Sequence, residues 1–349
     1  MKNKKKKGSG LRSALIALCV IQGLVLLVFG GLTGAIYYYA GRTNQISHQD
    51  QSMMTPEEAQ QYLATEETEI PDPDFSGPTM GQEDVDWGNE EEAPVEKTEQ
   101  IINILLIGQD RRPGEGRSRS DTMILCTVNK EAGTLTLTSF MRDLYVQIPG
   151  YGSTKMNAAY VWGGMALLNQ TIEKNFGIHI DGNVEVDFSQ FANIVDQLGG
   201  VELELRRDEA NWINGAAGYG QLTAGLQRMD GTQTMLYSRI RSLDPDADFS
   251  RTNRQRKVIN AIVTQTQDSS LTELLKLLDE ILPMFTTDMS SSQIIGYATD
   301  LFPMLSGVTV VSQRVPADGM YRGVMIDGMA CLVADMDATR QMLRQTLGG

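Results

Sequence analysis

Ile101-Ile102-Asn103-Ile104-Leu105-Leu106-Ile107 is a run that is apolar at every position except one. A β-branched run of this kind, bounded by polar residues, predicts a strand that is buried on both faces of a sheet. Residues 122–128 and 134–140 flank a polar turn at 129–133, and this pattern predicts an antiparallel hairpin. These three segments form the predicted centre of the fold.

Helical and strand patterns alternate beyond the hairpin. Helices are expected at residues 157–176 (ended by Gly177), 189–198, 232–237, 251–267, 271–282, 290–305 and 336–347. Strands are expected at residues 184–188, 201–205 and 308–315. Interleaved helices and strands predict an α/β (α+β mixed) fold, with a central mixed β-sheet covered by helices on both faces. Residues 100–349 are long enough to form one domain with a substantial core.

The N-terminus has the pattern of a membrane anchor. Five lysines and two arginines, with no acid, lie in residues 1–42. The apolar run at 13–40 exceeds the about 20 residues that cross a bilayer, and tyrosines stand near its far end. A cleaved signal peptide would have a shorter apolar region of about 7–15 residues. We therefore expect a cytoplasmic tail at 1–12, one transmembrane helix at 13–40 and an extracellular catalytic domain held at the cell membrane.

Residues 41–99 have the composition of a spacer. Sixteen acids and one lysine lie in residues 43–100, whereas the rest of the chain beyond them has a net charge of only −6. Such a segment is expected to be an acidic disordered linker, with a weak helix at 56–63. Nucleic acid is excluded as a partner because the predicted domain has no basic field.

Common nucleophiles and metal-binding clusters are missing from the sequence pattern. Cys126 and Cys331 stand in apolar contexts and are expected to be buried free thiols, although a disulfide between them stays open. No Ser–His–Asp arrangement can be argued, since His48 lies in the linker and His179 in an apolar stretch. Any chemistry should therefore depend on a metal ion and arginine.

Acidic and basic side chains follow the ends of the predicted strands. Asp110 follows the first strand and Asp121 opens the second, so the two carboxylates can converge on one Mg²⁺. Arg119 stands beside them, and Arg142-Asp143 follows the third strand. Turn formation would explain either aspartate alone, and a surface ion pair would explain Arg142-Asp143.

Two later motifs supply further arginines. Arg239 and Arg241 would point to one face of an extended segment, either toward an anion or toward solvent. Arg251, Arg254 and Gln255 have the i, i+3, i+4 spacing of one helix face, in a first turn that attracts anions. The neighbouring expectations are an N-terminal capping role near Asp248, a solvent-facing Arg256 and Lys257, an N-cap at Asn157, and a Lys155 that reaches a phosphate or a carboxylate.

The ordered set of motifs resembles the LytR-CpsA-Psr proteins of Gram-positive bacteria. The matching pieces run from residue 101 to 267 and are Gly108-x-Asp110-x-Arg112, Arg119-Ser120-Asp121-Thr122-Met123, Arg142-Asp143, Lys155-x-Asn157-x-Ala159-Tyr160, Asp196-x-x-Gly199-Gly200-Val201, Leu226-x-x-x-Asp230-Gly231, Tyr237-x-Arg239-x-Arg241 and Asp248-x-x-Arg251-x-x-Arg254-Gln255. Each motif alone is weak, whereas their order is specific.

The resemblance implies a phosphotransferase of cell-wall assembly. It would move a glycopolymer, such as teichoic acid or capsule, with one phosphoryl group from an undecaprenyl-diphosphate carrier in the membrane lipid to a hydroxyl of peptidoglycan. In the family pattern Asp110 and Asp121 hold Mg²⁺, and Arg119 lies beside the scissile bond. The diphosphate is held by Arg142, Arg239, Arg241, Arg251 and Gln255.

Other roles remain open within this resemblance. Asp143 is a candidate to accept the proton of the acceptor hydroxyl. Residues 165–176 and 191–198 are candidates to line an apolar prenyl pocket, although core packing explains them equally well. The alternatives are a prenyl-diphosphate hydrolase and a non-catalytic regulator that binds a lipid-linked ligand. The dozen cytoplasmic residues leave little room for a signalling domain.

Overall fold

The computed structural model describes residues 44–46, 52–66, 77–89, 98–109 and 117–347. The predicted transmembrane helix and Asp110 lie outside these residues. Within the described part of the chain, no helix has both the length and the apolar character needed to span a bilayer.

A mixed sheet forms the centre of the described fold, as predicted. Its seven strands run in the order β1-β10-β7-β2-β3-β4-β11. The pairs β2–β3, β3–β4 and β7–β10 are antiparallel, whereas β2–β7, β4–β11 and β1–β10 are parallel. The bounds are β1 (Asn44–Gln45), β2 (Ile101–Gln109), β3 (Ser120–Asn129), β4 (Thr134–Phe140), β7 (Gly182–Asp187), β10 (Thr286–Thr287) and β11 (Thr309–Val315).

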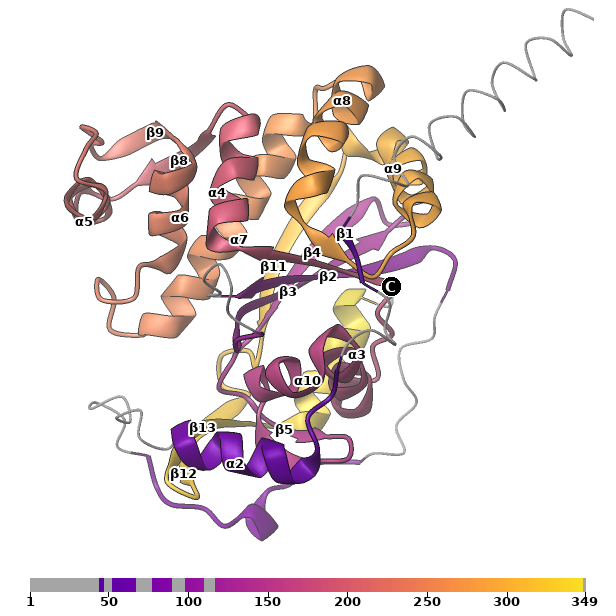
Figure 1. Ribbon diagram of the computed structural model, residues 1–349, viewed down its shortest axis with the longest axis vertical. Helices are drawn as coiled ribbons and strands as arrows, with labels where there is room; N and C mark the ends of the chain where they lie inside the picture. Colours follow the sequence, from indigo (N-terminus) through magenta and orange to yellow (C-terminus); the bar gives the residue numbers. More distant parts are fainter. Residues whose placement is uncertain (1–43, 47–51, 67–76, 90–97, 110–116, 348–349) are drawn as a thin grey trace, which may run out of the picture.

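Helices cover both faces of this sheet (Figure 1). On one face lie α3 (Asn157–Phe176) and α10 (Met336–Leu347), and on the other lie α4 (Phe188–Gln197), α7 (Ala247–Thr266), α8 (Leu271–Ile281) and α9 (Ser291–Leu305), with the short 3₁₀ turn η3 (Leu282–Met284). Side chains along β2 alternate between the two faces of the sheet, so they pack against the helices on both sides. Leu105 and Ile107 are buried in the cluster that includes α3, whereas Ile104 packs with the cluster near η3 and α9.

Helix α3 matches its predicted bounds and ends at Gly177, whose φ of 69° is left-handed. A kink at Gly163 and Gly164 interrupts the helix. Its apolar side chains, among them Leu168 and Ile172, are fully buried in the main core. The part of α3 after the kink is therefore packed into the core, which agrees with the core-packing alternative for residues 165–176.

A satellite unit packs beside α7. It contains β8 (Val201–Leu205), α5 (Arg207–Ala217), β9 (Gly225–Met229) and α6 (Gly231–Arg239) around a separate cluster of buried apolar residues. Gly231 N–H donates to Asp196 Oδ1 at 2.7 Å, which joins two motifs of the ordered set. A Cβ at Gly231 would collide with the carbonyl oxygen of Ala192, so this crossing of α4 and α6 requires glycine.

Two hairpins lie below the main sheet in the view of Figure 1. They are β5 (Tyr145–Ile148) with β6 (Gly152–Lys155), and β12 (Tyr321–Ile326) with β13 (Met329–Ala334). Neither was predicted. Cys331 is a buried residue of β13, and Cys126 is on β3; both are free thiols, as expected. Burial raises the pKa of each thiol to about 12.

Parts of the predicted linker belong to the fold. Besides β1, they are α2 (Pro56–Glu66) and the 3₁₀ turn η2 (Gln82–Asp84). Ala59 is buried in the main core, and Met54 N–H donates to Trp162 O at 2.8 Å. Val85 packs in the cluster of β12–β13. The prediction of disorder over 41–99 is wrong for these described stretches, because apolar residues spaced among the acids are enough to dock them.

Candidate active site

Several predicted site residues meet at one end of the sheet. Gln109, the last residue of β2, pairs with Ser120 at the start of β3 and with Asp187 at the end of β7. Asp121 follows directly, and Arg142 comes two residues after β4 ends. The hairpin register therefore places the polar residues after β4 beside those that open β3.

Arg142 is the centre of this cluster. Its Nη1 lies 2.9 Å from Asp121 Oδ1, and its Nε lies 2.9 Å from Asp248 Oδ2 and 3.4 Å from Asp143 Oδ2. Burial alone would lower the pKa of Arg142, but the three carboxylates outweigh it and raise the pKa above its ordinary value. The guanidinium is therefore fixed in place and permanently charged.

Asp143 has two cationic partners. Lys155 Nζ lies 2.9 Å from Asp143 Oδ1, which fulfils the expectation that Lys155 reaches a carboxylate. Burial would raise the pKa of Asp143, but Arg142 and Lys155 together lower it below the ordinary value. Asp143 is thus ionised at neutral pH, yet it is a weakened base.

Asp248 joins the helix α7 to the strand ends. Arg241 Nε lies 2.7 Å from Asp248 Oδ1, and Arg251 Nη2 lies 3.6 Å from its Oδ2. Arg251 also donates from Nη2 to the carbonyl oxygen of Asp121 at 3.4 Å. Burial, followed by the repulsion of Arg142, lowers the pKa of Arg251, while Asp248 opposes this. Three arginines from three separate segments thus share one carboxylate.

Arg119 lies at the edge of the same cluster, next to Tyr62 of α2. Its guanidinium carbon is 5.9 Å from the centroid of the Tyr62 ring, within cation–π range. Burial lowers the pKa of Arg119, and Tyr62 and Asp143 oppose this shift. Tyr62 was not predicted as a site residue, because nothing in the sequence of the acidic segment marks it as part of a site.

Arg239 differs from its prediction. It is the last residue of α6 rather than part of an extended segment, and Ile240 separates it from Arg241 as the helix C-cap. Its guanidinium carbon lies 4.2 Å from the centroid of the Phe188 ring. Phe188 begins α4 directly after β7, whose last residue pairs with Gln109. Arg239 therefore borders the same end of the sheet on the side of β7.

The residues that follow Arg251 point in different directions. Gln255 is half-buried, and its Oε1 has no hydrogen-bond partner among the described residues. Arg254 is buried elsewhere: its Nε lies 2.9 Å from Glu209 Oε1, and it also pairs with Asp244. Arg256, expected in solvent, is buried as well. Only part of the predicted helix face therefore belongs to the cluster.

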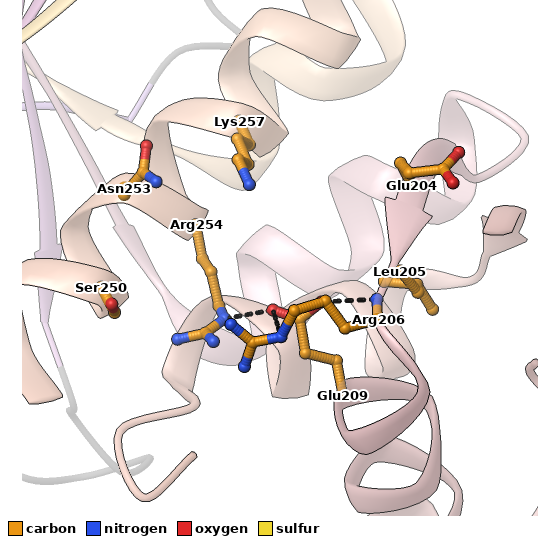
Figure 2. Close-up of a pocket in the computed structure, with 8 residues that line it drawn as sticks. All are labelled: Glu204, Leu205, Arg206, Glu209, Ser250, Asn253, Arg254 and Lys257. Atoms are coloured by element: carbon orange, nitrogen blue, oxygen red, sulfur yellow. Dashed lines mark hydrogen bonds and ion pairs between the residues drawn. The ribbon is translucent and has the colours of Figure 1, made fainter. Parts of the chain in front are cut away.

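Figure 2 shows the separate pocket beside Arg254, of about 310 Å³, where Arg254 and Arg206 both reach Glu209. The pocket lies between α7, α5 and the end of β8, and it shares no lining residue with the Arg142 cluster. Its buried charges are already paired. Arg254 is thus a structural link between α7 and the satellite unit.

Other polar groups support the site from behind. Asn157 is the first residue of α3 rather than its N-cap, and its N–H donates to Arg142 O at 3.2 Å. Gln109, Glu185 and Tyr160 form a buried hydrogen-bonded chain through the Glu185 carboxylate. Gln109 is the last residue of β2, so the chain of hydrogen bonds starts at the end of that strand.

The described residues include one predicted magnesium ligand, Asp121. Among these residues no three His, Cys, Asp or Glu side chains are grouped closely enough to hold a metal ion. The side chain of Asp121 is 29% exposed, and one of its oxygens accepts from Arg142. Mg²⁺ is commonly held by one or two carboxylates together with phosphate oxygens and water, so this donor fits such an ion.

Asp248 is an important partner whose role as a shared counter-ion of three arginines the sequence did not predict, whereas for Lys155 the sequence predicted a phosphate or a carboxylate contact without identifying Asp143. Asp248 is three residues before Arg251 and hence on the same helix face, a spacing that could have indicated an ion pair. Lys155 is the last residue of β6, where its partner depends on the tertiary fold. The described cluster contains five cations, Arg119, Arg142, Lys155, Arg241 and Arg251, against three carboxylates, Asp121, Asp143 and Asp248.

Comparison with known proteins places this arrangement in a family. The model of the LytR_cpsA_psr family matches residues 76–347. The polyisoprenyl-teichoic acid–peptidoglycan teichoic acid transferase TagU of Bacillus mycoides is 31% identical over 238 residues, which are 68% of this chain and 75% of TagU. The regulatory protein MsrR of Staphylococcus aureus is 35% identical over 168 residues, 48% of this chain and 49% of MsrR.

A solved structure has the same fold. Bacillus subtilis TagT bound to LI-WTA superposes with a TM-score of 0.60 at 25% identity, covering 76% of this chain and 99% of TagT. The family match spans most of the chain and contains every described site residue except Tyr62. The chain therefore belongs to the LytR-CpsA-Psr family.

Proposed function

We propose that this protein is a phosphotransferase that moves a glycopolymer, with one phosphoryl group, from an undecaprenyl-diphosphate carrier to a hydroxyl of peptidoglycan. The excess of positive charge around Arg142 is the observation that carries the proposal. Five cations face three carboxylates in the described cluster, which leaves two positive charges at a partly buried site. A diphosphate would neutralise this excess and accept hydrogen bonds from several guanidiniums.

The relatives support the same substrate class. TagU is named as a transferase of teichoic acid from a polyisoprenyl carrier to peptidoglycan, and TagT has been solved with LI-WTA bound. Applied to this chain, those names favour a lipid-linked wall polymer as the donor. The identity of the polymer, teichoic acid or capsule, would be decided by residues outside the charged cluster.

Each residue has a proposed role. Arg142, Arg239, Arg241, Arg251 and Gln255 would bind the diphosphate, and Arg119 would stand beside the scissile bond. Asp121, with Asp110 from the segment outside the described residues, would hold Mg²⁺, which would supply positive charge to the diphosphate oxygens. The lowered pKa of Asp143 suits an electrostatic partner of Arg142 and Lys155 better than a strong general base.

In the proposed step the acceptor oxygen attacks the phosphorus atom that is bonded to the sugar-linked oxygen. A new bond forms between that phosphorus and the acceptor oxygen. The bond from the phosphorus to the bridging oxygen breaks, and prenyl monophosphate leaves with the bond's electron pair. The acceptor proton passes to a carboxylate or to water. Positioning and charge stabilisation are the main demands of such a reaction, and the arginines supply both.

The carrier's prenyl chain would lie on the sheet face that α8 and α9 cover. Ile104, Val184 and Val186 on that face are only partly buried, in contrast to the closed core beneath α3. A membrane anchor at 13–40, with its N-terminus in the cytoplasm, would keep this face close to the bilayer that holds the carrier.

The proposal is tested with the full-length chain in detergent. Lipid-diphosphate oligosaccharide, peptidoglycan and Mg²⁺ are incubated with the protein, and the products are identified by mass spectrometry. The expected product is peptidoglycan that has gained the oligosaccharide and one phosphoryl group. A chelator arm, with Mg²⁺ restored afterwards, tests the metal requirement.

An arm without peptidoglycan separates the alternatives. Release of sugar phosphate at an equal rate with and without peptidoglycan would identify a prenyl-diphosphate hydrolase. Saturable binding of the lipid with no product in either arm would identify a non-catalytic regulator. Either result would reject the transferase proposal.

A further inference from the structure

Two arginines outside the Arg142 cluster lie close together with unpaired groups. Arg256 on α7 is 6% exposed, and its Nε and Nη1 are buried without a hydrogen-bond partner among the described residues. Arg314 on β11 has a buried Nε in the same condition. A buried cation that lacks a counter-charge is costly, so this pair requires an explanation.

The arrangement brings a hydroxyl to the same place. Arg314 pairs with Ser139 in the parallel register of β4 and β11, so both side chains point to one face of the sheet. Ser139 Oγ is buried and also has no partner in the described structure. On α7, Phe249 lies seven residues before Arg256 and thus on nearly the same helix face; its ring centroid is 4.3 Å from the Arg314 guanidinium carbon, which places α7 over this face.

The charges around the pair do not balance it. Burial, followed by the repulsion of Arg314, lowers the pKa of Arg256 to about 10. Arg314 is paired with Asp318, but that side chain is 86% exposed, and an ion pair of this kind contributes little. Because the side chain of Arg314 is itself 17% exposed, an incoming anion can reach it and replace Asp318.

We propose that Arg256, Arg314 and Ser139 form a second anion site, separate from the diphosphate site, which binds one phosphoryl group. The donors come from one helix and two strands, and together they would supply several N–H and O–H groups to the oxygens of one phosphoryl group. Two guanidiniums would balance the charge of a phosphate dianion. The phosphoryl group would come either from free phosphate or from a phosphodiester within a wall polymer.

The test measures the thermal unfolding of the full-length protein in detergent against increasing inorganic phosphate, with sodium chloride at matched ionic strength as the reference. A ligand that binds the native state raises Tm. We expect phosphate to raise Tm in the wild type. We expect the half-maximal phosphate concentration to rise at least tenfold in Arg256→Gln. In phosphate-free buffer the Tm of Arg256→Gln should equal or exceed that of the wild type, because an uncompensated buried charge has been removed.

Three further variants test which residues are responsible for the rise of Tm with phosphate. Arg228→Gln alters an exposed arginine that pairs with Glu202 at 3.2 Å, and it should respond as the wild type does. Arg142→Gln, in the diphosphate cluster, should retain the second-site response. Arg314→Gln, at a partly exposed position, tests the same site if Arg256→Gln fails to fold, and it should lose the response.

A short glycerol-phosphate oligomer, compared at equal phosphate concentration, separates the two sources. A stronger response to the oligomer would identify a polymer phosphodiester, and a stronger response to phosphate would identify the free ion. The proposal is overturned if Arg256→Gln and Arg314→Gln respond like the wild type. It is also overturned if Arg142→Gln abolishes the response, or if sodium chloride alone reproduces it.

Discussion

Arg142 Nη1 lies 2.9 Å from Asp121 Oδ1, although β3 and β4 separate the two residues along the chain. The pairing follows from the register of the β3–β4 hairpin, in which Ile124 faces Ser139. A slip of one residue would turn every side chain of a strand to the opposite face. The geometry of the charged cluster therefore depends on the same alternation of side chains that builds the core.

Asp121→Asn should reduce transfer by roughly 100-fold or more, the usual effect of removing one electrostatic contributor to a transition state. The amide keeps the shape of the carboxylate but loses the charge that would hold Mg²⁺. Product formation is measured by mass spectrometry, with thermal unfolding as a check on folding. Asp208→Asn, which alters an exposed carboxylate 3.0 Å from Arg206, is the control and should retain full activity. Wild-type activity in Asp121→Asn would remove this residue from the site.

Arg239→Gln should abolish most transfer while leaving stability within about 0.5 kcal/mol of the wild type, because the side chain is exposed. The expected loss of a charge-assisted contact to the diphosphate is about 10–100-fold in rate. Initial rates at several lipid concentrations measure this loss. Arg228→Gln is the control, since Arg228 is another exposed arginine and lies on β9 of the satellite unit, outside the charged cluster. Equal rates for the two variants would show that Arg239 does not contact the substrate.

Acid should weaken the link between α7 and the satellite unit. Hydrogen bonds from Arg206, opposed by burial and reinforced by Arg254, lower the pKa of Asp244 from 3.8 to about 2. A carboxyl whose folded-state pKa is depressed stabilises the protein above its unfolded pKa, and this contribution is lost as the pH falls through the folded value. Tm should therefore decrease between about pH 4 and pH 2, with a smaller decrease in Asp244→Asn. Parallel curves for the wild type and the variant would exclude Asp244 as a cause.

Gly231→Ala should destabilise the protein by roughly 1–3 kcal/mol, because the new methyl group would collide with the Ala192 carbonyl where α4 and α6 cross. Gly296→Ala is the matched control, since a Cβ there meets no atom within 4 Å. It should stabilise α9 by up to about 1 kcal/mol, the difference in helix propensity. Urea unfolding of both variants measures whether each substitution lowers or raises the free energy of unfolding. A neutral Gly231→Ala would mean that the two helices can separate without cost.

Local sequence predicted the main sheet and most helices, because their signals are local. The run at Ile101 and the glycine stop at Gly177 both act within a few residues. The β12–β13 hairpin was missed although Asp327-Gly328 forms its turn with φ values of 49° and 80°, a recognised two-residue turn signal. The two-residue strands β1 and β10 have no sequence signal, since they exist only through their pairing with the sheet edge.

The sequence predicted which residues belong to the candidate site better than it predicted where their side chains point. Arg251 and Arg254 are three residues apart, yet Arg251 faces Asp248 whereas Arg254 faces Glu209. Residues at i and i+3 differ by about 60° around a helix, so a helix placed between two acidic groups can send them to different partners. Spacing identifies a helix face, and only the surrounding fold decides which neighbour each side chain meets.

With the membrane anchor proposed above, the pairing of β1 with β10 would determine how far the domain can stand from the bilayer. Asn44 is already hydrogen-bonded into the sheet edge next to Thr286, and the predicted transmembrane helix ends at residue 40. Only residues 41–43 are left between them, a reach of roughly 10–15 Å even when fully extended. The catalytic unit would thus work as a short-tethered enzyme that meets its lipid donor at the membrane surface, and its acceptor would have to come to it.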